Sequence, residues 1–292
     1  MSAPWTVVGA PLNSSGTGGG EEAGPDAYRA AGLAERVRAS GQRDVDARIT
    51  TSERDAETGV IGFRDLVAAC SAVRDVVADE LRAGNRPLVV GGDCSFLPGA
   101  LAAARSIGAR PGLAFVDGHL DFYSPHASPT GEAADMDLAI VLGTGPDELT
   151  HLAGEPPLVD PGAVVVLGHR DPDEPAIDPT SAPGLAAIDA ATLLNSDLEH
   201  TAQRTLDELL GQTDSFWLHL DLDVLDERVL PAVSYSMPGG LDWAQLDQLL
   251  GPLLRSERLL GLSVADLRPD LDPDGRYAER VVALLERHAA RR

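Results

Sequence analysis

The chain has 292 residues, 43% of them hydrophobic and 24% charged, so it is long and apolar enough to bury a substantial core. Its formal net charge of −23 would repel phosphate backbones and anionic lipids, which argues against nucleic-acid and membrane partners. Neither a signal peptide nor a membrane-spanning apolar run is evident, so we expect a cytoplasmic protein. With only two cysteines, no structural disulfide is expected.

Apolar runs typical of buried strands alternate with segments of helical periodicity along the chain. We expect strands at residues 5–10, 87–91, 112–117, 163–168, 185–189, 216–224 and 259–266, with a weaker candidate at 44–49. We expect helices at residues 63–84, 95–107, 190–211, 241–256 and 275–290. Such alternation predicts a parallel sheet that is covered by helices on both faces.

Three segments rich in glycine, serine, proline or acidic residues interrupt this pattern and are expected to be loops, at residues 11–26, 123–131 and 170–184. None of them has the character of an interdomain linker. We therefore expect a single domain over residues 1–292. Ligands of open α/β sheets bind beyond the carboxyl ends of the strands, so the second and third loops are candidate parts of a site.

Two acidic clusters follow predicted strands: Asp117, His119 and Asp121 after the run at 112–116, and Asp221 and Asp223 after the run at 216–220. Because side chains alternate along a strand, we expect the members of each cluster to share one face. Four carboxylates and an imidazole brought together would repel and desolvate one another unless a cation lay between them. The clusters therefore predict a metal site with enough charge for two divalent ions.

A third motif, Gly-Gly-Asp-Cys-Ser at residues 91–95, also follows a predicted strand. Together with Asp-Gly-His-Leu-Asp at 117–121 and Asp-Leu-Asp-Val-Leu-Asp at 221–226, in this order, it resembles the ureohydrolase superfamily of arginase, agmatinase and formimidoylglutamase. The resemblance extends from about residue 85 to 270. It implies a three-layer α/β/α sandwich around a central, mainly parallel sheet of about eight strands.

The resemblance also implies a site for two divalent ions, expected to be manganese. Asp117 and Asp221 would bridge the two ions. The remaining implied ligands are Cys94 and Asp121 for one ion, and His119 and Asp223 for the other. The ions would supply a hydroxide that attacks the central carbon of a small cationic guanidino-type substrate. Asp226, just after the last motif, is expected to shape a turn.

Two positions depart from the superfamily pattern. Cys94 stands where the superfamily has a histidine ligand, and a thiolate there would bring a softer donor. Its alternative interpretation is a buried apolar thiol behind a degenerate site. Ala134 stands where a histidine donates a proton to the leaving amine, so that proton donor is expected to be absent. General acid help is typically worth about 100- to 10,000-fold in rate.

Both departures are shared with a branch of the superfamily that the sequence resembles, which acts in antibiotic (D-cycloserine) biosynthesis. That branch hydrolyses Nω-hydroxy-L-arginine to hydroxyurea and L-ornithine. An N-hydroxyguanidine is less basic than a guanidine, and its hydroxyl can bind metal or relay a proton. Such a substrate could compensate for the missing histidine.

Substrate-binding residues are implied by position. Asp173, with Asp171 beside it, matches the acid that binds the substrate ammonium, although a solvated acidic loop explains these residues about equally well. Positions that bind the substrate carboxylate in arginases correspond to Tyr123, Thr130 and Glu132. Thr130 could donate a hydrogen bond there, whereas Glu132 would repel a carboxylate.

The last implied catalytic residue is Asp266, in place of a glutamate that binds the guanidinium group, so Asp121 and Asp266 are our candidate catalytic acids. Arg268 has no role that the sequence assigns. His219 would either orient a ligand or be an ordinary core histidine. The remaining histidines without motif support are expected at the surface, and of these only His126 lies in a candidate site loop: His126, His151, His200 and His288.

Three other functions stay open. The chain could hydrolyse another guanidino compound such as agmatine, or be a catalytically silent relative that keeps its metal. A deacetylase-like activity ranks last, because the histidine pair that it needs is missing. The chain is expected to be a monomer or a small homo-oligomer.

Overall fold

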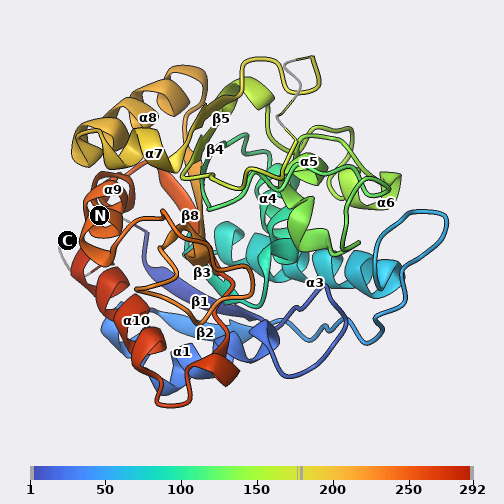
Figure 1. Cartoon of the computed structure of the whole chain (residues 1–292), viewed down its shortest axis with the longest axis horizontal. Coiled ribbons are helices and arrows are strands. Elements are labelled where there is room, and N and C mark those ends of the chain that lie inside the picture. Colours follow the sequence, from blue (N-terminus) through green and yellow to red (C-terminus); the bar gives the residue numbers. More distant parts are fainter. Residues whose placement is uncertain (1–2, 176, 178–179, 290–292) are drawn as a thin grey trace.

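A single parallel sheet organises the molecule. The computed structural model describes residues 3–175, 177 and 180–289. Within these residues, eight parallel strands pair in the order β2-β1-β3-β8-β7-β4-β5-β6 (Figure 1). Their bounds are β1 Trp5–Ala10, β2 Gly41–Asp44, β3 Arg86–Gly91, β4 Gly112–Val116, β5 Val164–Leu167, β6 Ala186–Ile188, β7 Phe216–Asp221 and β8 Leu259–Ala265. The expected sheet of about eight strands is confirmed.

Helices cover both faces of the sheet, which confirms the three layers (Figure 1). Helices α3 to α6 pack on one face, and α1, α2 and α7 to α10 pack on the other. Their bounds are α1 Gly24–Ala30, α2 Leu33–Arg36, α3 Phe63–Arg82, α4 Leu97–Ser106, α5 Asp137–Val141, α6 Asp147–Thr150, α7 Ala190–Leu194, α8 Leu198–Gln212, α9 Trp243–Arg255 and α10 Arg276–Ala289.

The central strands are buried on both faces, which explains their continuous apolar sequences. In β4, Ala114 and Val116 contact the core under α8 and α9, whereas Leu113 and Phe115 contact the core under α3 and α4. All five residues of this strand are buried. Strand alternation thus divides one apolar run between two hydrophobic cores.

The edge strand β2 differs from the prediction. It spans Gly41–Asp44 and shares only one residue with the expected strand at 44–49. All four of its residues are exposed, so it carries no apolar pattern that a sequence could reveal. Backbone pairing with β1 alone defines it, and Val45, the first buried residue after it, bonds through its amide to the Gly9 carbonyl.

Of two longer predicted elements, one is divided and the other is shorter than predicted. The expected helix at 190–211 is divided into α7 and α8, because Asp197 accepts a hydrogen bond from the amide of His200 and begins a new helix. The expected strand at 216–224 ends at Asp221 and continues as a 3-10 turn over Leu222–Val224. The short helices α1, α2, α5 and α6 were not predicted, because so few turns show little periodicity.

Several single-residue expectations can be checked directly. Cys70 and Cys94 are both buried, and both are free cysteines. His288 is buried rather than at the surface, because its imidazole Nε2 lies 2.7 Å from Asp247 Oδ1 of the neighbouring helix α9. His126, His151 and His200 are exposed, as expected. No helix in the described ranges has the length and apolar character needed to cross a bilayer.

Gly92 is required by a close backbone approach in the turn that follows β3. A Cβ atom at Gly92 would lie 1.5 Å from the carbonyl oxygen of Leu12, which no side chain can tolerate. The turn holds the Leu12 segment through a hydrogen bond from the amide of Asp93 to the same carbonyl, 3.1 Å long. Gly92 therefore lets the two segments approach closely beside the predicted metal site.

We expect Gly92→Ala to destabilise the fold by about 3 kcal/mol, because the backbone must move to relieve the overlap. Gly211, in α8, is the matched control, since a Cβ there meets no atom within 4 Å. Gly211→Ala should stabilise by up to about 1 kcal/mol through its helix propensity. Urea unfolding of both variants measures the difference, and equal stabilities would contradict the argument.

Candidate metal centre

The candidate ligands lie at the carboxyl ends of four neighbouring strands. Strands β3, β8, β7 and β4 are consecutive in the sheet. Cys94 follows β3, Asp117 follows β4, Asp221 ends β7 and Asp266 follows β8. The topology therefore brings together residues that are far apart in the sequence.

Local turns, rather than strand alternation, orient the two acidic clusters. Strand β4 ends at Val116, so Asp117, His119 and Asp121 do not share a strand face as we expected. Asp121 has a φ of 46°, in the left-handed region that few residues other than glycine adopt. Asp223 lies in the 3-10 turn after β7, where its amide donates to Asp221 Oδ1 over 2.7 Å.

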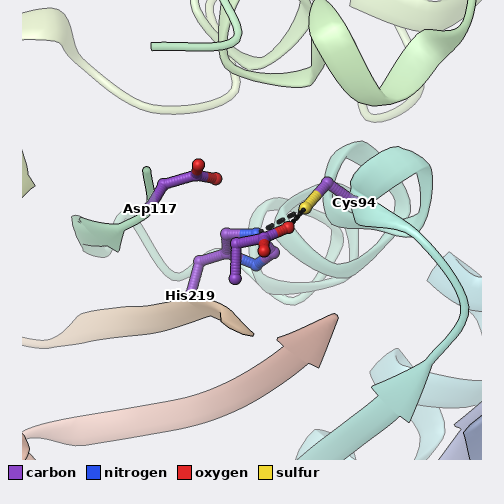
Figure 2. A group of neighbouring side chains, drawn as sticks. Cys94, Asp117 and His219 are labelled. Carbon is purple, nitrogen blue, oxygen red and sulfur yellow. Dashed lines mark hydrogen bonds between the residues drawn. The ribbon is translucent and has the colours of Figure 1, made fainter. Parts of the chain in front are cut away.

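Cys94 is held at the start of a 3-10 turn. Asp93 caps this turn by accepting a hydrogen bond from the amide of Ser95, and it also accepts one from the hydroxyl of Ser14, 2.6 Å away. The thiol of Cys94 then points toward the end of β7. Its Sγ lies 2.7 Å from Asp221 Oδ2 and 3.2 Å from His219 Nε2 (Figure 2).

All six predicted ligands are brought together, in groups whose ligand atoms lie within 4.8 Å of one another. One side of the centre combines Cys94 with Asp121, and the other combines His119 with Asp223. His119 Nδ1 lies 2.7 Å from Asp223 Oδ2. The complete groups are Cys94, Asp117, His219 and Asp221; Cys94, Asp121 and Asp137; Asp117, His119 and Asp223; and Asp221, Asp223 and Asp266.

The electrostatics of this cluster favour a bound cation. Burial, together with the neighbouring acids, raises the pKa of Asp117, Asp121 and Asp221 well above the ordinary range. Burial disfavours the charged form of His119, but the neighbouring carboxylates, chiefly Asp223, outweigh burial and raise the pKa of His119 to about 9. One imidazole cannot balance this many carboxyl groups, and mutual repulsion keeps them from ionising together without another positive charge.

The donor set fits divalent metal ions. Asp117 Oδ2 is buried and has no hydrogen-bond partner in the described part of the chain, which is what a vacant ligand atom looks like. Carboxylate oxygens, an imidazole nitrogen and a thiolate together suit transition metals such as manganese, iron, cobalt or zinc. The residues present therefore fit a centre with two ions.

His219, which sequence reasoning left undecided, is both a core residue and a neighbour of Cys94. Its ring is fully buried and stacks on Phe115, with the ring centroids 5.0 Å apart. Burial lowers its pKa to about 3, so the imidazole is neutral.

Ser263 contacts the imidazole of His219. Its Oγ accepts from the indole of Trp217 at 3.0 Å, lies 2.8 Å from His219 Nδ1 and lies 3.5 Å from the Leu218 carbonyl oxygen. Because a hydroxyl both donates and accepts, this contact satisfies either tautomer of His219. In both tautomers His219 Nε2 faces the Cys94 sulfur.

A cavity of about 400 Å³ adjoins the metal ligands. Thr130, Glu132, Asp171 and Asp266 line it, as the sequence predicts for substrate-binding residues, whereas the exposed Asp173 is not among its lining residues. Ala134 also lines this cavity, at the position where the superfamily has its proton-donating histidine. The cavity is therefore strongly acidic and has an alanine beside the metal centre.

Several predicted substrate-binding groups already have partners within the protein. The hydroxyl of Thr130 donates to Asp135 Oδ2 over 2.6 Å. Asp171 Oδ1 accepts from the amide of Asp173. Glu132 Oε2 accepts from the hydroxyl of Tyr235 over 3.0 Å. A substrate would meet Asp171 and Glu132 through their remaining carboxylate oxygens, whereas the one hydroxyl of Thr130 already donates to Asp135 and accepts from the amide of Glu132.

Glu174 and Glu21 are two of the cavity-lining acids to which the sequence assigned no role. Glu174 accepts hydrogen bonds from the amides of Leu120 and Asp121, so it holds the loop that carries a ligand. Its sequence neighbours are also acidic, so nothing in the sequence singled it out. Glu21, in the expected loop at 11–26, lies in a 3-10 turn, and burial raises its pKa.

Arg268 and Asp226 are structural. Arg268 binds Asp270 over 2.7 Å and lies 3.6 Å from Glu21, which gives it the role that the sequence could not assign. Asp226 accepts from the amides of Arg228 and Gly239, and it shapes the turn as expected.

We predict that Cys94→Ser removes a thiolate ligand from the centre. The cobalt-loaded protein should show a sulfur-to-cobalt charge-transfer absorption, and the variant should lose it because a hydroxyl is a poorer metal ligand. Cys70→Ser is the matched control, since Cys70 is equally buried but donates to the Ser95 carbonyl and belongs to none of the candidate ligand groups found among the described residues. An unchanged spectrum in Cys94→Ser would contradict the assignment.

Comparisons with known proteins agree with this geometry. The family model described as Arginase family matches residues 3–290. An arginase of Bacillus caldovelox is 30% identical over 289 residues, covering 97% of this chain and 96% of the relative. Its crystal structure superposes with a TM-score of 0.86 at 26% identity, covering 98% of this chain and 97% of that one. The arginase structure from Bacillus subtilis strain 168 superposes with a TM-score of 0.89 at 25% identity, covering 99% of both chains. The chain therefore belongs to the arginase family, whose members hydrolyse amidino C–N bonds.

Proposed function

We propose that this protein hydrolyses Nω-hydroxy-L-arginine to hydroxyurea and L-ornithine, with two divalent ions, preferably manganese. The observation that carries the proposal is Ala134, whose side chain lines the cavity where the leaving amine would otherwise meet a histidine. A methyl group cannot transfer a proton. A substrate with its own hydroxyl on the guanidino group reduces this need, because that hydroxyl can relay the proton.

Residues around the cavity orient such a substrate. When bound, the two ions supply the hydroxide nucleophile. Asp266 lines the cavity beside Asp221 and Asp223, so its carboxylate is placed to bind the guanidino group. Its backbone is in the left-handed region, with a φ of 69°, and its Oδ2 accepts from the amide of Ser234. These contacts hold one oxygen and leave the other for the substrate.

The acidic wall of the cavity suits a cationic substrate. Asp171 and Glu174 line it close to His119, whose Nε2 lies 3.9 Å from Asp171 Oδ2. An ammonium group at the far end of the substrate would find a complementary field there. This arrangement supports recognition of the α-ammonium by the loop after β5, through Asp171 and Glu174 more directly than through Asp173.

A second candidate substrate is a guanidinoalkylamine such as agmatine, which has no carboxylate. Glu132 favours it, because this half-buried acid faces the cavity and would repel a substrate carboxylate. Among the described lining residues, Arg268 is the one arginine, and Asp270 and Glu21 already engage it. The cavity thus offers a carboxylate little positive charge.

The decisive assay compares three substrates with the manganese-loaded protein. We expect hydroxyurea from Nω-hydroxy-L-arginine at least about 100-fold faster than urea from L-arginine, because only the latter needs the missing general acid. Mass spectrometry of the products measures both rates. Faster turnover of agmatine would favour the second candidate, and metal-loaded protein inactive on all three would indicate a catalytically silent relative.

Glu132→Gln separates the two candidate substrates further. Removing one negative charge should lower the KM for a substrate carrying a carboxylate by about tenfold. The KM for agmatine should stay the same or rise. Glu155→Gln is the matched control, since its carboxylate is 94% exposed and does not line the cavity. Steady-state kinetics with both variants tests this, and an unchanged KM for the amino acid would place its carboxylate elsewhere.

A further inference from the structure

Asp137 is a buried acid with no structural explanation. It is the first residue of α5, in the segment Asp-Leu-Ala-Ile-Val, and its exposed fraction is 0%. The other residues of this helix are apolar and belong to the core under α3 and α4, or are buried beside it. A carboxyl group in such surroundings is costly unless something compensates it.

No side chain among the described residues provides that compensation, and the backbone amide of Leu138, which favours the charged form of Asp137, does not reach hydrogen-bond geometry. Both carboxylate oxygens of Asp137 are buried and lack a hydrogen-bond partner among the residues that the structure describes. Its side chain does not cap α5, whose preceding residue Met136 also provides no side-chain cap. The charged groups that act on it, Asp221, Asp93 and Asp135, are all acidic. Native proteins rarely leave such a group without a partner, so a missing ligand is indicated.

The position of Asp137 identifies that ligand as a metal ion. One of its oxygens, the Cys94 sulfur and an oxygen of Asp121 all lie within 4.8 Å of one another. Atoms that bind one metal at about 2.0–2.3 Å are at most about 4.6 Å apart, so these three need little movement to share an ion. Asp137 is not among the residues that line the substrate cavity. It therefore faces the ion from the protein interior and does not face the substrate.

We propose that Asp137 is an additional ligand of the ion held by Cys94 and Asp121, beyond the six ligands that the family resemblance implies. The proposal rests on the metal centre that the proposed function needs, but not on the identity of the substrate. Its oxygen donor adds hard character to a position softened by the thiolate of Cys94. The extra carboxylate thereby favours manganese or iron over softer ions at this position.

The test measures metal binding directly. Wild type, Asp137→Asn and Asp137→Leu are stripped of metal, and manganese binding is followed by calorimetry and elemental analysis. We expect two ions per wild-type chain and at least about tenfold weaker binding of one ion in both variants, with the second ion retained. Glu132→Gln is the matched control, because this cavity acid belongs to none of the candidate ligand groups and should bind both ions normally.

Asp137→Leu also distinguishes a ligand from a merely structural group. Replacing an unpartnered buried acid by an apolar side chain should raise the thermal stability of the metal-free protein while it weakens metal binding. Wild-type metal affinity in both variants would overturn the inference and leave the proposed function intact. A wild-type chain that binds no manganese would overturn both. Cobalt spectra of folded Asp137→Asn provide a second readout, since loss of a ligand shifts the visible bands.

Discussion

The constraint on which this site depends is the repulsion among carboxyl groups buried at neighbouring strand ends. Asp117, Asp221 and Asp223 come within a few ångströms of one another because β4 and β7 are adjacent. No arrangement of protein groups alone stabilises them all in the charged form, and His119 compensates only Asp223 well. The buried acids therefore favour the binding of metal ions, and the other residues of the site lie around the candidate ion positions.

Much of the architecture could be predicted because its signals are local. Buried parallel strands have continuous apolar sequences, and each motif of candidate ligands directly follows one of them. The order of elements and the clustering of the six candidate ligands could therefore be predicted. The edge strand β2 could not be predicted, because backbone pairing defines it and its side chains are exposed. The turns that orient Asp121 and Asp223 could not be predicted either, since tertiary contacts select their backbone conformations.

The residues that the sequence did not identify share a physical reason. Glu174 lies among other acids, and only the folded loop shows that its carboxylate binds the amides of Leu120 and Asp121. Asp137 did carry a signal, a lone acid that opens a run of buried apolar residues. That signal becomes interpretable only when the partners at the site are known. At position 134, by contrast, the informative feature was already visible in the sequence: an alanine stands where the superfamily has a histidine.

The strand order has a consequence for how the enzyme is made. Strand β8, the last to be synthesised, lies between β3 and β7 in the sheet. On a growing chain, β3 with Cys94 cannot join the β7–β4 half with Asp221 and Asp117 until residues 259–265 have left the ribosome. Such non-local parallel pairing forms slowly. The two halves of the candidate metal centre are thus brought together by a strand near the C-terminus. A nascent chain cut short before it carries all six candidate ligands but has unpaired sheet edges and lacks the strand that joins the two halves.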